Sequence, residues 1–184
     1  MVLETKRLYI RRFEEKDLAD FNQYASDPEV GPSAGWKPHE SMKESEEILE
    51  GFMKSADIFA MEHKKDGRVI GSLGLHEDRK RDYKGALMLG YAMGKDYWGQ
   101  GLMTEAVDRL LQYAFSELDM KIISAYHYPF NQRSKRVLVK AGFSLEGTLK
   151  MASALYDGQV VDDVCYAITR EEYEKSREKS EDQI

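Results

Sequence analysis

Two glycines stand one residue apart at the start of an amphipathic helix, within the segment KDYWGQGLMTEA of residues 95–106. A glycine has no Cβ, so a ligand can approach the backbone of Gly99 and Gly101 closely. The first N–H groups of a helix have no acceptor within the helix, and they favour an anion there. A glycine pair also forms ordinary tight turns, which is the alternative interpretation. The arrangement predicts a pyrophosphate site on the backbone of residues 98–104.

Two common phosphate-binding motifs do not fit this segment. A Walker A loop needs Lys and then Ser or Thr directly after its last glycine. Here GKDYWG (94–99) ends at Gly99 and is followed by Gln100 and Gly101. A dinucleotide fingerprint needs a third glycine where Thr104 stands. It also needs an acidic residue at the end of the next parallel strand, which the segment KIISAYHY (121–128) lacks. The turn is therefore not that of a P-loop or a Rossmann domain.

The composition is that of one ordinary globular domain. The chain has 184 residues, and its formal net charge of −6 argues against a general nucleic-acid binder. No run of 18 apolar residues occurs, so we expect no membrane-spanning helix. The single cysteine, Cys165, excludes an internal disulfide, fits a cytoplasmic location and is expected to be a buried strand thiol. The four histidines have no metal-ligand spacing, and we expect no metal site.

Periodicity of apolar residues predicts the elements that must position these groups. A loop rich in Gly and Pro covers residues 26–40. The predicted order, βααβββαβαββ, is typical of an α+β fold with one mixed sheet. Strands are expected at 7–13, 57–64, 68–76, 86–93, 121–128, 144–155 and 159–168, and helices at 14–25, after Ser41, from 102 and over 131–142.

Two motifs in the right order make the chain similar to the GCN5-related N-acetyltransferases (GNAT). They are YWGQGLMTEA (97–106) and NQRSKRVLVKAGFSLEG (131–147), separated by a helix and a strand. Within the family, the sequence resembles the RimJ/RimL-type branch, which acetylates α-amino groups of ribosomal proteins. The resemblance extends from residue 4 to residue 168. It implies a mixed, mostly antiparallel sheet with a splay between two parallel central strands and helices on both faces.

The resemblance implies acetyl-CoA as the acetyl donor and no metal. In the family, the pyrophosphate lies on the amides of the first motif, and the pantetheine arm extends the strand that ends near Met93. Asn131 and Ser134 of the second motif lie beside the pantetheine and thiol. Basic residues 133, 135, 136 and 140 would supply phosphate charge or form a solvated helix face. The expected acetyl-CoA contacts are Met93, Trp98, Gly99, Gln100, Gly101, Leu102, Met103, Thr104, Asn131 and Ser134.

Three positions depart from the family pattern. Asp96 stands where an Arg or Gln is frequent, and Leu138 stands where many relatives have the Tyr that protonates the leaving thiolate. Ser153 occupies the position of a RimL-like glutamate base. In the RimL-like pattern, a serine at the position of Ser134 takes the place of the missing Tyr. Its alternative role is that of a first-turn helix residue with a locally satisfied hydroxyl.

Acetyl transfer needs a polarised thioester carbonyl, a base for the ammonium and an acid for the thiolate. We expect the N–H of Met93 to polarise the carbonyl. His127, at the end of a strand and four residues before Asn131, is the first candidate for the base, and a packed strand histidine is the alternative. His76 is a weaker candidate. Trp36 and Tyr83 lie on loops expected to flank the acceptor entrance. Each side chain could contact the substrate or instead fill the core.

The predicted activity is N-acetylation of a primary amine, with a protein or peptide N-terminal α-amine as the first choice of acceptor. A small amine such as a polyamine, amino sugar or aminoglycoside is the alternative acceptor. A non-catalytic acyl-CoA-binding module is a further alternative, because Leu138 and Ser153 depart from the catalytic pattern. We expect no nucleic-acid or membrane partner and a monomer or homodimer. The acetyltransferase domain is expected over 1–170, followed by a charged tail over 171–184, partly helical or frayed.

Overall fold

One mixed sheet organises the chain, whose computed structural model describes residues 2–181. The strand order is β1-β2-β3-β4-β5-β6-β8-β7, with β5 and β6 parallel and every other neighbouring pair antiparallel. This confirms the predicted α+β fold. The strands are β1 (Val2–Glu4), β2 (Leu8–Arg11), β3 (Ile58–His63), β4 (Arg68–Glu77), β5 (Ala86–Met93), β6 (Ile122–His127), β7 (Ser144–Ala154) and β8 (Val160–Thr169).

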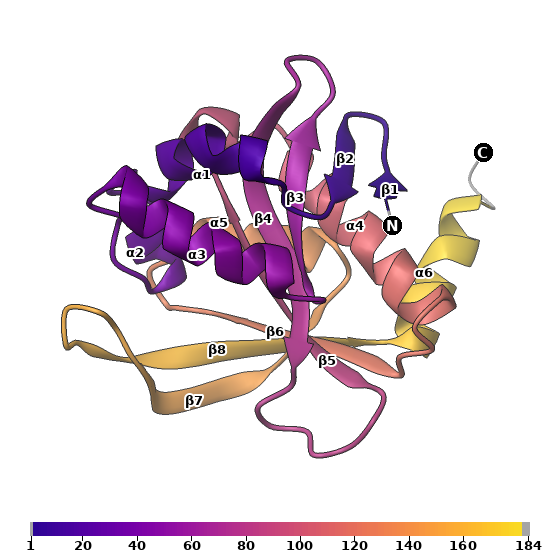
Figure 1. Cartoon of the computed structure of the whole chain (residues 1–184). Coiled ribbons are helices and arrows are strands. Elements are labelled where there is room, and N and C mark those ends of the chain that lie inside the picture. The colour runs from indigo at the N-terminus through magenta and orange to yellow at the C-terminus, as the bar shows by residue number, and fades with distance from the viewer. Residues whose placement is uncertain (1, 182–184) are drawn as a thin grey trace.

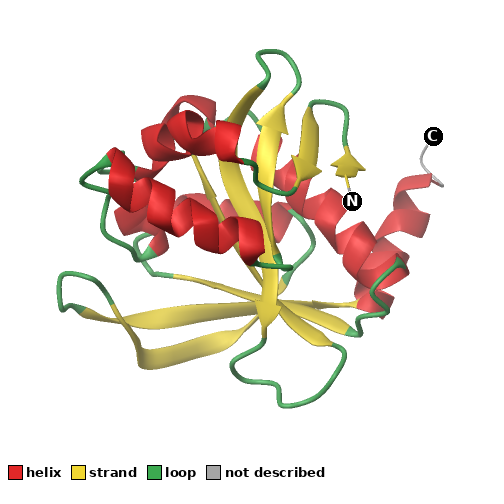
Figure 2. Cartoon of the chain, in the orientation of Figure 1, coloured by secondary structure: helices red, strands yellow, loops and turns green. Residues whose placement is uncertain are grey.

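Helices cover both faces of the sheet. Figure 1 shows α1, α2 and α3 grouped on one side of β3 and β4, with α4 and α6 on the other side, and Figure 2 shows the same layers by element type. Two short 3-10 helices cover 15–17 and 95–97. The helices are α1 (Leu18–Ala25), α2 (Val30–Ala34), α3 (Met42–Lys54), α4 (Leu102–Ser116), α5 (Gln132–Lys140) and α6 (Arg170–Glu181).

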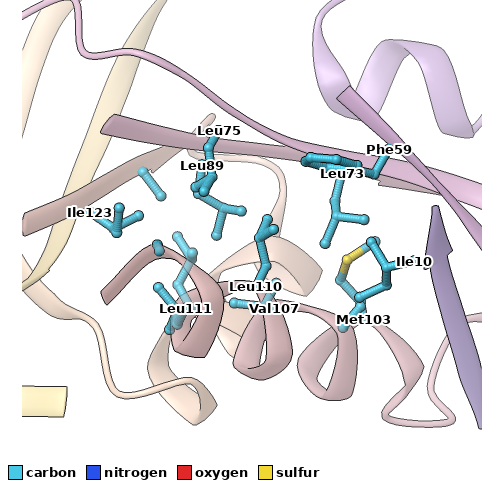
Figure 3. Packing of buried hydrophobic residues seen from close by; sticks show 14 of the residues in the cluster. Ile10, Phe59, Leu73, Leu75, Leu89, Met103, Val107, Leu110, Leu111 and Ile123 are labelled. Atoms are coloured by element: carbon cyan, nitrogen blue, oxygen red, sulfur yellow. The ribbon is translucent and has the colours of Figure 1, made fainter. Parts of the chain in front are cut away.

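Helix α4 forms the larger core with the sheet. Its apolar residues recur at helical spacing, so one stripe of the helix is buried while the other is polar. Figure 3 shows Met103, Val107 and Leu110 pointing at side chains of β2, β3, β4, β5 and β6. Leu110 is fully buried, and truncation of such a residue to Ala costs about 2–5 kcal/mol. This packing fixes the N-terminus of α4 against the end of β5.

The opposite face carries a smaller, aromatic-rich core under α1 and α3. Phe21 lies 5.8 Å from Phe13 and 5.4 Å from Phe52 between ring centroids. Helix α3 begins at the predicted cap, where Ser41 Oγ accepts a hydrogen bond from the Glu44 N–H (3.1 Å). The two helices therefore form a fixed wall above β4 and β5.

The parallel strands separate after three paired residues. Only Ala86–Met88 pair with Ile122–Ser124, although β5 continues to Met93 and β6 to His127. Beyond Met88 the β5 edge that faces β6 therefore lacks a neighbouring strand. The splay expected from the family resemblance is confirmed.

Three features of the fold differ from the sequence expectations. Helix α2 lies inside the predicted loop, because its Gly31, Pro32 and terminal Gly35 give it the composition of a turn. The N-terminal strand prediction covers only the second of two paired strands, β1 and β2. Cys165 is half-buried in β8, not fully buried.

The charged tail is helical from Arg170 to Glu181 and docks on the domain through Tyr173 and Arg177. Helix α6 buries Tyr173 against Phe115, with ring centroids 5.2 Å apart, and Arg177 pairs with Asp108. Of the two forms expected for the tail, partly helical or frayed, the described part up to Glu181 is helical, and one aromatic anchor docks the helix. The remaining part of that expectation, residues 182–184, lies outside the described residues.

Candidate active site

The glycine turn adopts the backbone conformation that its residues favour. Trp98 (φ −66°, ψ 154°) followed by Gly99 (φ 75°) is typical of a type II turn, and Gly101 (φ 77°) is the N-cap of α4. A Cβ on Gly99 would have no heavy atom within 4 Å. The glycines are therefore needed for their positive φ, and the space beside them is open to a ligand.

Free backbone donors line this turn. The first hydrogen bond of α4 runs from the Glu105 N–H to Gly101 O (3.1 Å), so the N–H groups of Leu102, Met103 and Thr104 have no acceptor in the helix. The Trp98 N–H instead donates to Lys95 O (3.0 Å). The predicted amide cradle of residues 98–104 is thus too long by one residue, because the 3-10 turn before it uses the Trp98 amide.

A cavity of about 410 Å³, here called the turn cavity, opens beside this turn. Arg133, Arg136 and Lys140 of α5 line it, and its lining residues in the described chain include no carboxylate. The Arg133 guanidinium lies 3.9 Å from the Trp98 ring centroid and donates to Ser33 Oγ (3.1 Å). Of the expected contacts, it is lined by Met93, Trp98, Gly99, Gly101, Met103, Thr104, Asn131 and Ser134.

Two expected contacts, Leu102 and Gln100, are not among the residues that line the turn cavity. Leu102 is buried in the core and can offer only its N–H group. Gln100 turns its side-chain amide to Asp96 O (3.0 Å). Lys135 does not line the turn cavity either, although it was one of the four basic residues considered for phosphate charge.

Arg7 holds the turn from the other end of the chain. Its Nη1–H donates to Gln100 O (2.9 Å), its Nε–H donates to Glu105 Oε2 (2.7 Å), and its Nη2 lies 3.6 Å from the Cβ position of Gly101. Burial would raise the pKa of Glu105, but hydrogen bonds from Thr5 and Arg7 lower it, so the ion pair persists. The sequence does not reveal Arg7 as a partner of the turn, because no local motif links it to residues 93 positions away.

The end of β5 directs backbone donors into the splay. Gly71 pairs with Met93, and the Gly94 N–H donates to Ile70 O (2.8 Å). Gly71 and Met93 are therefore a non-hydrogen-bonded pair, so the N–H of Met93 points away from β4 and toward the gap beside β6. The Met93 carbonyl accepts from the indole of Trp98 (2.7 Å). This orientation matches the role expected of the Met93 N–H.

Ser134 lies at the first turn of α5 and shares a hydrogen bond with a tyrosine. Its Oγ is 2.8 Å from the Tyr91 hydroxyl, and its N–H donates to Asn131 Oδ1 (3.1 Å), which caps the helix. Burial raises the pKa of Tyr91, so its hydroxyl is a neutral donor. Leu138, at the family's Tyr position, is fully buried in the core. Tyr91 on β5 was not foreseen, because its partner is brought close only by the fold.

A second cavity, of about 320 Å³, lies against the sheet below α2 and α3 and is here called the sheet cavity. It shares Ser33, Ala34, Tyr91, Ala92, Asn131 and Ser134 with the turn cavity, so the two meet at the splay. Within the described chain its lining includes no Asp, Glu, Lys or Arg. Its other lining residues are Trp36, Phe52, Ile58, Ser72, Leu73, Gly74, His76, Met88, Leu89, Gly90, Tyr126, His127 and Tyr128.

Residues 7–144, and hence most of the chain, match the acetyltransferase (GNAT) domain family. The chain belongs to the GNAT acetyltransferase family. As a GNAT enzyme it is an N-acetyltransferase with acetyl-CoA as the acetyl donor, and the turn cavity with its free N–H groups and three cations fits that donor. The non-catalytic alternative is therefore not supported.

Several relatives of this GNAT protein align with nearly its whole length. The N-acetyltransferase p20 of Bacillus licheniformis is 28% identical, covering 93% of this chain and 97% of the relative. The [ribosomal protein uS5]-alanine N-acetyltransferase of Escherichia coli is 29% identical, covering 95% and 94%. A GNAT-family acetyltransferase structure from Bacillus anthracis superposes with a TM-score of 0.83 at 26% identity, covering 93% and 99%.

Of the other residues singled out in the sequence, one lines the sheet cavity and three lie outside both cavities. Trp36 lines the sheet cavity, whereas Tyr83 is exposed and lies outside its lining. Ser153 is buried and donates to Asp163 Oδ1 (2.7 Å), and Asp96 lines neither the turn nor the sheet cavity. In residues 2–181, no helix is long and apolar enough to cross a membrane and no His, Cys, Asp and Glu cluster could hold a metal ion.

His127 and His76 both line the sheet cavity but have different partners. His127 is buried, its Nδ1 is 2.8 Å from Tyr128 O and its ring lies 5.6 Å from that of Tyr166. His76 is partly exposed, and its Nδ1 is 2.9 Å from Asp57 Oδ2. The base role expected of His127 stays a prediction, and the pairing of His76 makes it a competitor.

Proposed function

We propose that this N-acetyltransferase modifies the N-terminal α-amine of a protein or peptide. The observation that carries this proposal is the absence of Asp, Glu, Lys and Arg from the described lining of the sheet cavity. A polyamine or aminoglycoside brings several ammonium groups, and burying them without carboxylates is costly. A peptide end brings only one amine, and small or apolar first residues suit the walls formed by Trp36, Tyr126 and Tyr128.

The same cavity favours an α-amine over a lysine side chain. The attacking nitrogen must be neutral, and an uncharged cavity disfavours its ammonium form. With reference pKa values of about 7.8 and 10.4, roughly a quarter of α-amines but only about one lysine in a thousand are neutral near pH 7.4. The cost of losing the proton is thus several kcal/mol smaller for the α-amine, about 1.4 kcal/mol per pKa unit.

The donor is proposed to lie in the turn cavity, with its pyrophosphate on the N–H groups at the start of α4. The macrodipole of α4 and the cations of Arg133, Arg136 and Lys140 favour the phosphates there. The thioester then reaches the splay, where the N–H of Met93 points into the gap. A fixed backbone donor polarises the carbonyl without reorganisation during the reaction.

The leaving thiolate is proposed to receive its proton from Ser134. The Ser134 hydroxyl lies where the two cavities meet, and Tyr91 donates to or accepts from it at 2.8 Å. A proton passed to sulfur by Ser134 is replaced from the neutral Tyr91 hydroxyl. Together the two hydroxyls supply the acid that Leu138 cannot provide.

The E. coli relative supports the choice of acceptor, because its name gives a ribosomal-protein alanine as the acetylated residue. With a protein N-terminus as acceptor, we propose a cytoplasmic location, where the single cysteine of the chain remains reduced.

The test uses a short peptide that carries both a free N-terminus and an internal lysine. After incubation with acetyl-CoA, fragmentation mass spectrometry locates the acetyl group, and we expect it on the α-amine. The same peptide with a blocked N-terminus is the matched control and should give no product. Acetylation only at lysine, or activity only with polyamines, amino sugars or aminoglycosides, would contradict the proposal.

A further inference from the structure

The ring of His76 lies on the floor of the sheet cavity, over two glycines. His76 pairs with Met88 and Gly74 pairs with Gly90 in the β4–β5 register, so these four residues share one face of the sheet. The His76 Nε2 is 3.1 Å from the Cβ position of Gly74 and 3.2 Å from that of Gly90. Any larger residue at either position would crowd the ring. The two glycines therefore leave room for this imidazole on the face of the sheet that α3 covers.

Asp57 fixes the proton on the other ring nitrogen. The His76 Nδ1 is 2.9 Å from Asp57 Oδ2, and the second oxygen of Asp57 accepts from the Ser55 hydroxyl. Burial would raise the pKa of Asp57, but the hydrogen bonds from Ser55 and His76 hold it below its ordinary value. An ionised carboxylate favours the proton on Nδ1, which leaves the Nε2 lone pair free to accept one.

We propose that His76 is the general base of the transfer, and that Asp57 positions it. The proposal deepens the proposed function, because it names the group that makes the acceptor nitrogen neutral. It applies to whichever primary amine the enzyme acetylates, since every such amine must lose a proton before it attacks. An N–H at Nδ1 held by a carboxylate also stabilises the imidazolium that forms.

The proton balance of the step is complete. Nε2 of His76 takes one proton from the R–NH3+ group and later releases it to water. The neutral nitrogen forms the N–C bond, the C–S bond breaks, and the thiolate receives a proton from the Ser134–Tyr91 pair. The nitrogen loses its second proton, which restores that pair. The products are the amide, free CoA thiol and one proton.

His127 lies on the opposite face of the sheet from His76. Along β6, His127 shares its face with Ile123 and Ala125, which belong to the core under α4. Its Nε2 is buried and has no hydrogen-bond partner in the described structure. The contacts of His127 are the Tyr128 carbonyl and the Tyr166 ring, whereas His76 has the Asp57 carboxylate. The titratable groups facing the cavity besides these are Tyr91, Tyr126 and Tyr128.

The test is steady-state kinetics of His76→Gln with an amine that the wild-type enzyme acetylates. We expect kcat/KM to fall about 100-fold or more, while the Kd for acetyl-CoA stays unchanged. The rising limb of kcat against pH should disappear in this variant. In Asp57→Asn kcat should fall by about 10-fold, because the imidazole loses the carboxylate that holds its Nδ1 proton. A purely structural role would leave the pH profile in place.

The chain contains a matched control for the pair. His63 Nδ1 is also 2.9 Å from an aspartate, Asp66, but His63 lines neither the turn nor the sheet cavity. His63→Gln should keep wild-type kinetics. Folded, acetyl-CoA-binding His76→Gln with an unchanged kcat and pH profile would overturn the proposal, as would loss of the pH limb in His127→Gln alone. A wild-type enzyme that acetylates only small amines would refute the peptide acceptor, and the His76 test would then use that amine.

Discussion

The turn cavity and the sheet cavity share six lining residues but are built in different ways. The turn cavity depends on consecutive backbone groups at the start of α4 and on three cations of α5. The sheet cavity is made of side chains from α2, α3, β4, β5 and β6, and its described lining has no formally charged Asp, Glu, Lys or Arg. The turn cavity therefore suits the anion that we propose for it, and the sheet cavity suits a neutral amine.

In the proposed arrangement, this difference separates the two substrates by charge before any chemistry occurs. The phosphates would be stabilised where donors and cations gather, and the amine would lose its proton to His76, which Asp57 positions. The hydroxyls of Ser134 and Tyr91 lie at the boundary, where the thiolate would form. The comparison therefore predicts that variants of one cavity affect one substrate or one step.

The largest effect is expected for Gly101→Val. At φ 77° a branched residue is strained by about 1–2 kcal/mol, and its side chain would enter the space proposed for the phosphates. We expect the acetyl-CoA Kd to weaken by at least about 100-fold, equal to about 2.8 kcal/mol. Isothermal titration calorimetry measures this Kd, and circular dichroism confirms that the variant is folded.

Gly158→Val is the matched control for backbone strain. Like Gly101, Gly158 has a positive φ (85°). A Cβ at Gly158 would have no heavy atom within 4 Å, and the residue lies in the β7–β8 turn, outside the turn and sheet cavities. This control should lose stability and keep its acetyl-CoA affinity. Equal loss of affinity in both variants, or unchanged affinity in folded Gly101→Val, would show that the turn does not bind the phosphates.

The second effect is expected at the boundary of the two cavities. Ser134→Ala and Tyr91→Phe each remove one hydroxyl of the hydrogen-bonded pair, and each should lower kcat by about 10- to 100-fold with little change in acetyl-CoA Kd. The double variant should be hardly slower than either single variant, because the hydroxyls act as a unit. Stopped-flow detection of the released CoA thiol measures the chemical step.

Tyr83→Phe controls for the loss of a tyrosine hydroxyl, since Tyr83 is exposed and lines neither cavity. It should leave kcat unchanged. Additive losses in the Ser134 and Tyr91 double variant would mean that the two hydroxyls act independently, and normal kcat in Ser134→Ala would remove the acid role.

The contrast also explains which parts of the site are visible in the sequence. Residues 98–104 are contiguous, so glycines, a helix start and a known motif could be recognised together. Even there, Arg7 is 93 residues from the Gln100 carbonyl it binds, and no local pattern relates them. The Trp98 amide was misassigned because a 3-10 turn is hard to distinguish from a loop by composition.

The sheet cavity is largely invisible in the sequence because its parts meet only after folding. Asp57 and His76 are 19 residues apart across the β3–β4 hairpin, and Gly74 and Gly90 matter to them only through strand register. Strand positions were predicted well, but the face of each histidine depends on pleat parity in the assembled sheet. His127 is therefore the first candidate for the base from its place near Asn131, whereas the structure shows that it shares a face with the α4 core.

The smallest effect is expected for Arg133→Ala, and it tests the charge difference itself. Arg133 lies 3.9 Å over Trp98 and lines the turn cavity, at an exposed position where water screens its charge. Acetyl-CoA affinity should weaken about 3- to 10-fold at low salt and by less at about 0.5 M salt, because ions screen the phosphates. The KM for the amine should not change.

Arg177→Ala is the matched control for this last variant, because Arg177 lies 5.1 Å over Tyr173 and pairs with Asp108 on the α6 side of the molecule. It removes an arginine–aromatic contact of the same kind without touching either cavity, so acetyl-CoA affinity should not respond. If Arg133→Ala instead raised the amine KM, the two cavities would not be electrostatically separate. A salt-independent loss of affinity would assign Arg133 to packing on Trp98, and the phosphate charge would then come from Arg136 and Lys140.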